Sequence, residues 1–489
     1  MPYIRIPTPL RKFTQGESRI QVEGADLLAA LDDLVQRYPD LGQHLLDSDR
    51  SIRPFLRVYV GDQDVQTLGG AAASLQSEDV VSLVPAIAGG KEETAESSAD
   101  LRKPRGDFSK AELERYSRHL IIPEFNLEGQ KRLKDARVLV VGTGGLGAPL
   151  LQYLAAAGIG TIGVLDFDRV EDSNLQRQVL FTTADIGRPK VEVAAERIRA
   201  QNPYIQVNVH QTRLTSENAL DIIKDYDIVA DGTDNFATRY LVNDACVLLD
   251  KVNVYASIFR FEGQVSVFNW PKDDGSRGPN YRDLFPQPPP PGLVPSCAEG
   301  GVIGVLPGIL GSLQANEVIK VASGVGQPLA GRLLLVDAAD LETRVLRLER
   351  NPENPLNGEN PSQKELIDYQ EFCGLNEVRS VPAVEREIDV QELKTLLESE
   401  KPPVVIDVRE PHEYAIVDLG GRLIPQDQIR DRVDEIPQDG QVVVHCRSGV
   451  RSARVIDLLE REFGFRNLYN LKGGVLAWAE EIDQSLATY

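Results

Sequence analysis

The sequence predicts a multidomain α/β protein, and three observations support this prediction. The chain has 489 residues, which at about 150 residues per domain suggests roughly three domains. Its 42% apolar and 26% charged residues are ordinary globular usage, so a wholly disordered, collagen-like or coiled-coil chain is excluded. Runs of strand character alternate with helical patterns in three blocks, and polar stretches separate the blocks.

Charge and cysteine content narrow the class of protein. Lys and Arg number 53 and Asp and Glu number 74, and the net charge of −21 makes the average surface repel nucleic acid and anionic membranes. The four cysteines form no Cys-x-x-Cys pair, which favours a reducing compartment; Cys246 and Cys373 are read as structural. No signal-peptide pattern opens the chain, and the most apolar stretch, 302–313, is too short to span a membrane. We therefore expect a cytoplasmic protein without nucleic-acid or membrane partners.

Residues 1–90 follow the strand and helix order of a β-grasp fold. Two short strand patterns come first, and a helix follows them that Asp26 can cap. The apolar face of this helix is expected to contain Leu27, Leu28, Leu31, Leu34 and Val35. The expected strands are 3–7, 19–24, 55–60 and 80–84.

Residues 108–350 alternate strands and helices, which is typical of a Rossmann-like, parallel doubly wound sheet. A helix over 110–120 opens the block. The buried strand 137–141 runs into the sequence GTGGLG and a helix that reaches Ala157. Later strands are expected at 161–166, 227–231 and 251–256.

Residues 386–489 repeat the same alternation on a smaller scale. The stretches 91–107 and 351–385 are polar and lack apolar periodicity, so we interpret them as linkers between the three domains. The proline-rich piece 285–295 is interpreted as a loop that crosses the middle domain. The last block has expected strands at 404–407, 442–445 and 468–470.

A glycine-rich loop, Gly142–Gly147, lies between a predicted strand and a predicted helix. Glycines let the backbone approach phosphates, and the N-terminus of a helix favours their negative charge. Asp166 ends the next strand, where a carboxylate that binds ribose belongs. These features alone are also typical of an NAD-dependent dehydrogenase.

Charged residues further along favour ATP chemistry over hydride transfer. Arg177 lies in SNLQRQ, Lys190 in GRPK and Asp234 in DGTDNFATR. Reaction at a phosphate needs cations that neutralise developing charge and a carboxylate that holds Mg²⁺. Charges on an ordinary helix surface remain the alternative interpretation of Arg177 and Lys190.

With these motifs, residues 112–350 resemble the bacterial adenylyltransferases of the MoeB/ThiF type, which activate sulfur-carrier proteins and are relatives of ubiquitin-activating enzymes. The sequences RYSR (115–118), PSCAEGG (295–301) and GVLPG (304–308) also match that family. The resemblance implies ATP, with Mg²⁺ at Asp234, and a homodimer in which Arg177 reaches the neighbouring subunit's site. The residues implied to surround ATP are Gly142, Gly144, Gly145, Asp166, Ser173, Asn174, Leu175, Gln176, Arg177, Lys190, Asp234 and Asn235.

The sequence departs from that family at its structural zinc site. The family usually holds zinc with two Cys-x-x-Cys pairs, which fall here at Asn280 and Asp283 and near Asn354 and Asn357. Amides do not replace thiolates as zinc ligands, so we expect no zinc. Cys297 is implied by the resemblance to be a thiol that can bond to the activated carrier, and a buried small hydrophobe is the alternative.

A second loop, HCRSGVRS, lies between a predicted strand and a predicted helix. A cysteine at such a turn faces backbone N–H groups and a helix N-terminus, which favour its thiolate. With Asp407 and Arg409 earlier in the chain, residues 386–489 resemble a rhodanese sulfurtransferase domain. The alternative is a cysteine-based phosphatase, which places its arginine one position further from the cysteine than Arg451 lies from Cys446. The His-Ile motif often seen between the Asp-x-Arg strand and the active loop is absent, which leaves the substrate preference open. The expected persulfide loop is Cys446, Arg447, Ser448, Gly449, Val450 and Arg451.

Residues 1–90 resemble ubiquitin-like sulfur carriers of the MoaD/ThiS/CysO type. The matching pieces are 18–24, 61–65, 68–70 and the ending LVPAIAGG, which closes on Gly89 and Gly90. A terminus without Cβ atoms is thin enough to enter an adenylation site. A carrier needs a free carboxylate, however, and Lys91 follows Gly90. The start of a flexible linker is therefore the alternative interpretation of the two glycines.

The expected function is ATP-dependent adenylation of the C-terminal glycine of a sulfur carrier, followed by transfer of a persulfide sulfur that leaves a thiocarboxylate. The expected catalytic residues are Arg177, Asp234, Cys297 and Cys446. The carrier is either residues 1–90, freed by a protease that cuts after Gly90, or a separate protein. An upstream persulfide donor such as a cysteine desulfurase is expected, and the molybdopterin, cysteine and thiolation pathways stay open. The alternative is a catalytically inactive docking scaffold for sulfur carriers.

Overall fold

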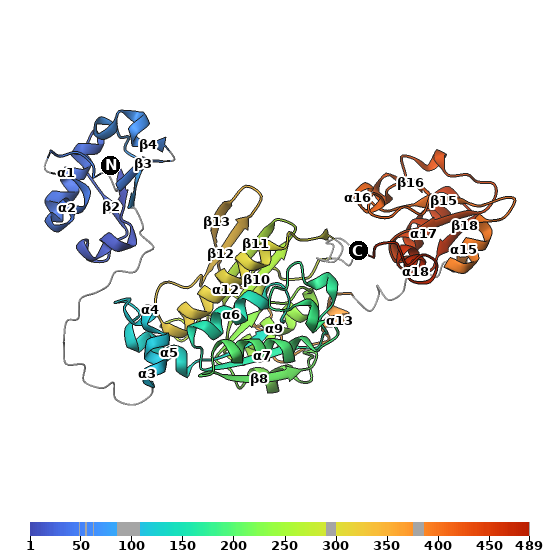
Figure 1. Ribbon diagram of the computed structural model, residues 1–489, viewed down its shortest axis with the longest axis horizontal. Coiled ribbons are helices and arrows are strands. Elements are labelled where there is room, and N and C mark those ends of the chain that lie inside the picture. The colour runs from blue at the N-terminus through green and yellow to red at the C-terminus, as the bar shows by residue number, and fades with distance from the viewer. Residues whose placement is uncertain are drawn as a thin grey trace. The chain divides into compact units, whose positions relative to one another are not determined.

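The computed structural model describes residues 1–47, 49–53, 56–61, 63–85, 108–289, 300–374 and 386–488 (Figure 1). The chain divides into two compact units, Met1–Lys103 and Pro104–Tyr489. The described residues form three sheets, one in each of three parts that we call the N-terminal part (1–85), the middle part (108–374) and the C-terminal part (386–488). No helix among these residues has both the length and the apolar character to cross a membrane.

The N-terminal part is a mixed five-stranded sheet with the strand order β2-β1-β5-β3-β4. Its first and last strands, β1 (Tyr3–Arg5) and β5 (Val80–Pro85), pair in parallel at the centre, as a β-grasp fold requires. The helix α1 (Leu27–Arg37) begins where expected, because the Asp26 side chain accepts a hydrogen bond from the Ala29 N–H at 2.9 Å. The remaining elements are β2 (Arg19–Gln21), β3 (Leu56–Val60), β4 (Gln63–Asp64), α2 (Gly42–Leu45) and four short 3₁₀ turns.

The middle part is an eight-stranded sheet with the order β13-β12-β11-β10-β9-β6-β7-β8. The five strands from β10 to β8 are parallel to one another, and the three from β11 to β13 are antiparallel. The strand pattern of the sequence predicted only the parallel portion of this sheet, and the structure adds the three antiparallel strands. The strands are β6 (Arg137–Val141), β7 (Thr161–Asp166), β8 (Gln206–Gln211), β9 (Ile228–Asp231), β10 (Val252–Phe259), β11 (Glu262–Phe268), β12 (Arg332–Asp337) and β13 (Glu342–Arg347).

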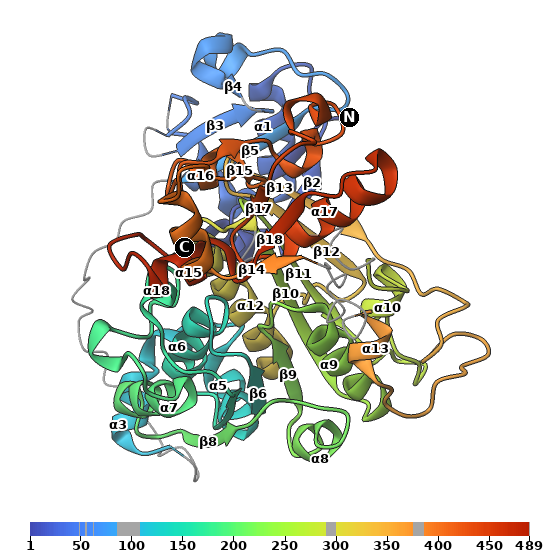
Figure 2. The same ribbon diagram turned by 90° about the vertical axis from the view of Figure 1, so that its right-hand side faces the viewer.

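Helices cover both faces of this sheet. One apolar core lies under α5, α6, α7 and α12 and a second lies under α8, α9 and α13; Figure 2 shows α6 and α12 on one side of the strands and α9 on the other. The apolar stretch that contains Pro307 forms the first turns of α12, where a missing N–H costs no helical hydrogen bond. The helices are α3 (Lys110–Arg115), α4 (Ser117–Leu120), α5 (Asn126–Asp135), α6 (Gly147–Ala157), α7 (Lys190–Gln201), α8 (Ala219–Ile223), α9 (Phe236–Leu248), α10 (Tyr281–Leu284), α12 (Val305–Ser323) and α13 (Tyr369–Phe372).

The segment 351–374 corrects the expected linker 351–385. Asn354 is 1% exposed and Tyr369 is 4% exposed, and both are hydrogen-bonded to residues of the middle part. This segment therefore packs as part of the middle fold. The polar composition of residues 351–374 suggested a linker, because the partners of its buried polar groups are visible only in the tertiary structure.

The C-terminal part is a five-stranded parallel sheet with the order β14-β18-β17-β15-β16. The predicted strands 404–407 and 442–445 are confirmed as β15 (Val404–Asp407) and β17 (Val442–His445). The other elements are β14 (Glu387–Ile388), β16 (Arg422–Leu423), β18 (Leu468–Leu471), α15 (Val390–Leu397), α16 (Pro411–Tyr414), α17 (Val450–Phe463) and α18 (Gly474–Glu481).

Candidate active site

The glycine loop joins β6 to α6 at the carboxyl edge of the parallel strands. Gly142 has φ +91°, a conformation that favours glycine, and its N–H donates to the Leu165 carbonyl at 2.8 Å. A Cβ on Gly147 would lie 2.0 Å from the Gly142 oxygen, so only glycine lets α6 start this close to the loop. The loop after β9 is adjacent, because a Cβ on Gly142 would lie 3.0 Å from the Gly232 oxygen.

Asp166 holds the glycine loop in place. Its Oδ2 accepts hydrogen bonds from the Thr143 N–H at 2.8 Å and from the Thr143 hydroxyl at 2.7 Å. Its Oδ1 accepts from the Asp168 N–H at 3.0 Å, and the side chain is buried. The carboxylate at the end of β7 is thus a structural partner of the loop, and Oδ1, which accepts only one hydrogen bond, keeps a further acceptor position for a ligand hydroxyl.

The segment 173–178 lies against the same loop. The Arg177 guanidinium donates to the Ser173 carbonyl at 3.0 Å, and its Cγ lies 3.6 Å from the position of a Cβ on Gly145. Asn174 and Gln178 are buried, and among the described residues neither side-chain oxygen, Asn174 Oδ1 or Gln178 Oε1, has a hydrogen-bond partner. Buried polar atoms without partners are the places where a polar ligand fits. Gln178 was not among the predicted binding residues, although its motif SNLQRQ was recognised.

Lys190 begins α7 and is almost fully buried. Its side chain is 7% exposed, and Nζ forms an ion pair at 3.2 Å with Oδ2 of Asp168, which lies two residues beyond the end of β7. The cation is therefore held near the glycine loop by a half-exposed carboxylate. A phosphate arriving at this edge would compete with Asp168 for the same ammonium group.

The loop after β9 carries Asp234 and Asn235. Asn235 caps α9, because its Oδ1 accepts from the Thr238 N–H at 2.9 Å. Asp234 is exposed and offers a carboxylate, which is the ligand type that Mg²⁺ prefers. Asp231 is fully buried, and burial raises its pKa although Arg239 and Thr233 oppose that shift. Within the described residues, no group of three or more His, Cys, Asp or Glu side chains could hold a metal ion.

The predicted persulfide loop joins β17 to α17, and Cys446 lies at its base with no exposed surface. The Cys446 Sγ accepts from the Gly449 N–H at 3.2 Å and from the Ser452 hydroxyl at 3.5 Å. The single Ser452 hydroxyl proton can instead be donated to Asn470 Oδ1, which lies 2.7 Å away. The sulfur thus faces N–H and O–H donors that stabilise negative charge on it.

Glu413 is a partner of this loop that was not predicted from the sequence. The Arg451 guanidinium pairs with the Glu413 carboxylate through two hydrogen bonds of 2.6 Å. Burial opposes ionisation, but the bonds from Arg451 and from the Glu410 N–H lower the pKa of Glu413. Glu413 lies in the sequence REPHEY, which matches no catalytic motif. Its role could not be predicted from that sequence, because its partner Arg451 lies 38 residues away.

Asp407 and Arg409 form a fully buried ion pair beneath the loop. Arg409 donates to both Asp407 oxygens and also to the backbone oxygens of Glu413 and Val417. Burial lowers the pKa of the neighbouring His445, although Asp407 at 3.7 Å opposes that shift. This pair fixes the segment that presents Glu413 to Arg451.

The remaining cysteine predictions divide into two groups. Cys246 and Cys373 are buried, as expected for structural residues, and burial raises the pKa of Cys373 to about 11. Cys297, Gly89 and Gly90 lie outside the described residues.

The four positions at which zinc ligands were considered hold amide and carboxylate groups that are hydrogen-bonded to one another. Asn280 donates to Asn357 at 3.0 Å, and Asn354 donates to Asp283 at 2.7 Å. Zinc sites in proteins use Cys, His and carboxylate ligands, and a lone carboxylate among three amides does not fit that set.

Comparison with known proteins shows three family matches along the chain. The ThiS family model matches residues 4–90, the ThiF family model residues 116–356 and the rhodanese-like domain model residues 389–481. A probable adenylyltransferase/sulfurtransferase MoeZ of Mycobacterium tuberculosis is 48% identical over 393 residues, which is 80% of this chain and 98% of the relative.

Two further relatives cover different lengths of the chain. The adenylyltransferase and sulfurtransferase MOCS3 of Bos taurus is 40% identical over 433 residues, which is 83% of this chain and 94% of the relative. A sulfur carrier protein adenylyltransferase of Thermus thermophilus is 58% identical over 268 residues, which is 55% of this chain and 99% of the relative.

Proposed function

Because this chain belongs to the family of adenylyltransferase/sulfurtransferases, we propose that it activates the C-terminal glycine of a ubiquitin-like sulfur carrier with ATP and then transfers sulfur to it from a persulfide on Cys446. One observation supports this proposal above the others. The same chain carries a ThiS-type domain and a rhodanese-type cysteine loop. It also carries residues that can bind phosphate in the loops that follow the neighbouring strands β6, β7 and β9.

In the proposed first step, a carboxylate oxygen of the carrier forms a bond to the α-phosphorus of ATP, and pyrophosphate leaves. The glycine loop and the N-terminus of α6 receive the phosphates, while Lys190 neutralises charge that develops there. Arg177 supplies a second cation, either beside Gly145 of its own chain or, as the resemblance implies, in the site of the neighbouring subunit of the proposed homodimer. Asp234 would hold Mg²⁺, which supplies further charge neutralisation. Asn174, Gln178 and Asp166 provide acceptors for the nucleoside. The remaining predicted contacts, Gly144, Ser173, Leu175, Gln176 and Asn235, complete the proposed site.

In the proposed second step, the terminal sulfur of a Cys446 persulfide attacks the carrier's acyl-adenylate and AMP leaves. The carrier is then joined to Cys446 through an acyl disulfide. A second thiol, for which Cys297 is the candidate in this chain, attacks the Cys446 sulfur; the thiocarboxylate leaves, and a disulfide remains that a cellular thiol reductant must reduce. The N–H and O–H donors around Cys446 stabilise the sulfur anions of this sequence.

Two activities separate the two steps experimentally. Exchange of labelled pyrophosphate into ATP, dependent on a carrier that ends in Gly-Gly, reports the first step alone. We expect Cys446→Ser to keep this exchange and to lose transfer of sulfur to the carrier. Absence of exchange in the unaltered protein would overturn the adenylation step and leave a docking scaffold for sulfur carriers.

The identity of the carrier and the domain limits are part of the same proposal. We propose domains at 1–90, 108–374 and 386–489, a cytoplasmic homodimer and an upstream persulfide donor. The intact mass of the protein purified from its own cells under reducing conditions tests the carrier. A released fragment ending at Gly90 would mean that the chain activates its own carrier after proteolysis, whereas only uncut chain would point to a separate carrier.

A further inference from the structure

Two segments of the middle part meet at the four positions where zinc ligands were considered. We call the group Asn280, Asp283, Asn354 and Asn357 the clasp. Asn280 caps the short helix α10, because its Oδ1 accepts from the Arg282 N–H at 2.9 Å. Asp283 completes the turn by accepting from the Asn280 N–H at 2.7 Å through Oδ2. One half of the clasp is therefore a rigid turn.

The second half is pinned to the first by side-chain hydrogen bonds. Asn280 Nδ2 donates to Asn357 Oδ1 at 3.0 Å, and Asn354 Nδ2 donates to Asp283 Oδ1 at 2.7 Å. The Asn351 N–H donates to the same Asp283 oxygen at 2.9 Å. Asp283 thus accepts three hydrogen bonds and lies at the centre of the clasp.

A buried ion pair continues the connection into α9. Arg282 and Asp244 are joined by hydrogen bonds of 2.7 to 3.2 Å, and their side chains are 2% and 0% exposed. Asp244 also accepts from Gln363 at 2.9 Å and from the Tyr369 hydroxyl at 2.8 Å. The segment 351–372 is therefore bonded to α9 and α10 at several points beyond the clasp itself.

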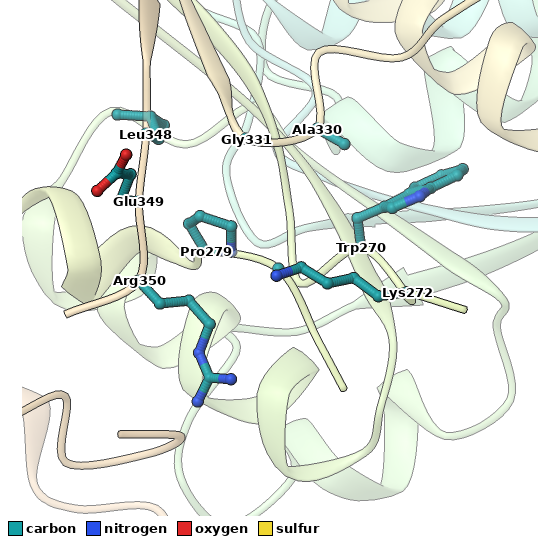
Figure 3. Close-up of a pocket in the computed structure, with 9 residues that line it drawn as sticks. Trp270, Lys272, Pro279, Ala330, Gly331, Leu348, Glu349 and Arg350 are labelled. Carbon is teal, nitrogen blue, oxygen red and sulfur yellow. The ribbon is translucent and has the colours of Figure 1, made fainter. Parts of the chain in front are cut away.

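The clasp also lies beside the pocket shown in Figure 3. This pocket has a volume of about 390 Å³, and its lining includes Trp270, Pro279 and Arg350. Pro279 and Arg350 directly precede Asn280 and Asn351, and the Arg350 guanidinium bonds to the Asn357 carbonyl. Movement of the two halves of the clasp would therefore move two walls of this pocket, on which Trp270 reports.

We propose that the clasp joins its two segments without a metal ion and takes the structural place of a four-ligand zinc site. The amide and carboxylate groups are already engaged as donors and acceptors with one another, and three amides with one carboxylate are a poor zinc set. The connection between the two segments consequently needs neither zinc nor reduced thiols. This inference does not depend on the proposed enzymatic function, because it concerns only how the middle part is held together.

Metal analysis and chelation test the absence of zinc directly. We expect the purified full chain to contain far less than one zinc per chain, and its thermal unfolding midpoint to be unchanged by a strong zinc chelator. Trp270 and Trp478 are the only tryptophans, so a Trp478→Phe variant makes Trp270 fluorescence a reporter of the middle part. Stoichiometric zinc, or a midpoint lowered by the chelator, would overturn the proposal.

Substitution at Asp283 tests the hydrogen bonds. Asp283→Asn keeps the size of the side chain but turns one acceptor atom into a donor that faces an N–H group. We expect the Trp270 midpoint to fall by about 3–10 °C. Asp273→Asn removes the same charge from an exposed position nearby and is the matched control, with no comparable fall. Equal effects of the two substitutions would contradict a structural role of the clasp.

A designed zinc site tests whether the four positions converge. The combined variant Asn280→Cys, Asp283→Cys, Asn354→Cys and Asn357→Cys should bind one zinc per chain and become sensitive to the chelator. A soluble variant that binds no zinc would contradict the convergence. Asn280→Ala and Asn357→Ala, made singly and together, give a second measurement: their effects on the midpoint should be non-additive, and additive effects would contradict the contact.

Discussion

At the scale of single residues, the cationic side chains that we propose to bind charged ligands are held by partners distant in sequence. Lys190 is positioned by Asp168, and Arg451 is positioned by Glu413. A lysine or arginine aimed at a site without such a partner would lose rotamer freedom only on binding. The partners therefore orient the cations before a ligand arrives.

Arg177 offers the most direct test at this scale. We expect Arg177→Ala to lower carrier-dependent pyrophosphate exchange by about 100-fold, because loss of one group that stabilises transition-state charge has effects of that size. Lys110→Ala, at an exposed position on α3, is the control and should leave exchange unchanged. Equal exchange in the two variants would place Arg177 outside the reaction.

Glu413 predicts a pH dependence of stability in the C-terminal part. Its pKa is lowered in the folded chain, so its contribution to stability is present above the unfolded pKa of about 4.3 and is lost as the pH falls through the lower folded value. In a Trp270→Phe background, Trp478 in α18 reports unfolding of this part. Glu413→Gln should flatten the loss of stability below about pH 5, and an unchanged slope would contradict the role given to the Arg451 pair.

At the scale of elements, α6 begins directly against the glycine loop, and we propose that this arrangement lets the loop bind phosphate. Gly147→Ala introduces a Cβ where the Gly142 oxygen already lies, so the loop must move. We expect ATP affinity, measured by calorimetry, to fall at least tenfold, while the Trp478 transition of the C-terminal part stays unchanged. Normal ATP affinity would show that the phosphates bind elsewhere.

Local sequence patterns predicted the helices, strands and loops better than they predicted which of these elements contact one another. The strands β15 and β17 and the cap at Asp26 follow from short-range alternation and capping chemistry, and they were confirmed. The packing of 351–374 and the antiparallel strands β11 to β13 were missed. The packing of 351–374 depends on contacts far apart in sequence, as the bond from Asn280 to Asn357 shows, and so does the pairing of β11 with β12. The pairs β10–β11 and β12–β13 are hairpins of neighbouring segments, whose strand pattern was passed over.

At the scale of the whole molecule, three family matches in one chain suggest consecutive steps of one reaction path. Covalent connection raises the effective concentration of each site for the product of the previous one. The proposal therefore predicts that the middle and C-terminal parts cooperate on a single carrier. It also predicts that Cys446→Ser cannot complete the sequence and that Arg177→Ala completes it about 100-fold more slowly.

The mass of a carrier after reaction tests this sequence most directly. The full chain, loaded with a persulfide at Cys446, is incubated with ATP, Mg²⁺, a thiol reductant and a carrier that ends in a free Gly-Gly. We predict that the carrier gains the mass difference of one oxygen replaced by sulfur, that omission of ATP abolishes the gain, and that Cys446→Ser stops the reaction after adenylation. An unchanged carrier mass with the loaded, ATP-supplied protein would contradict the proposed function.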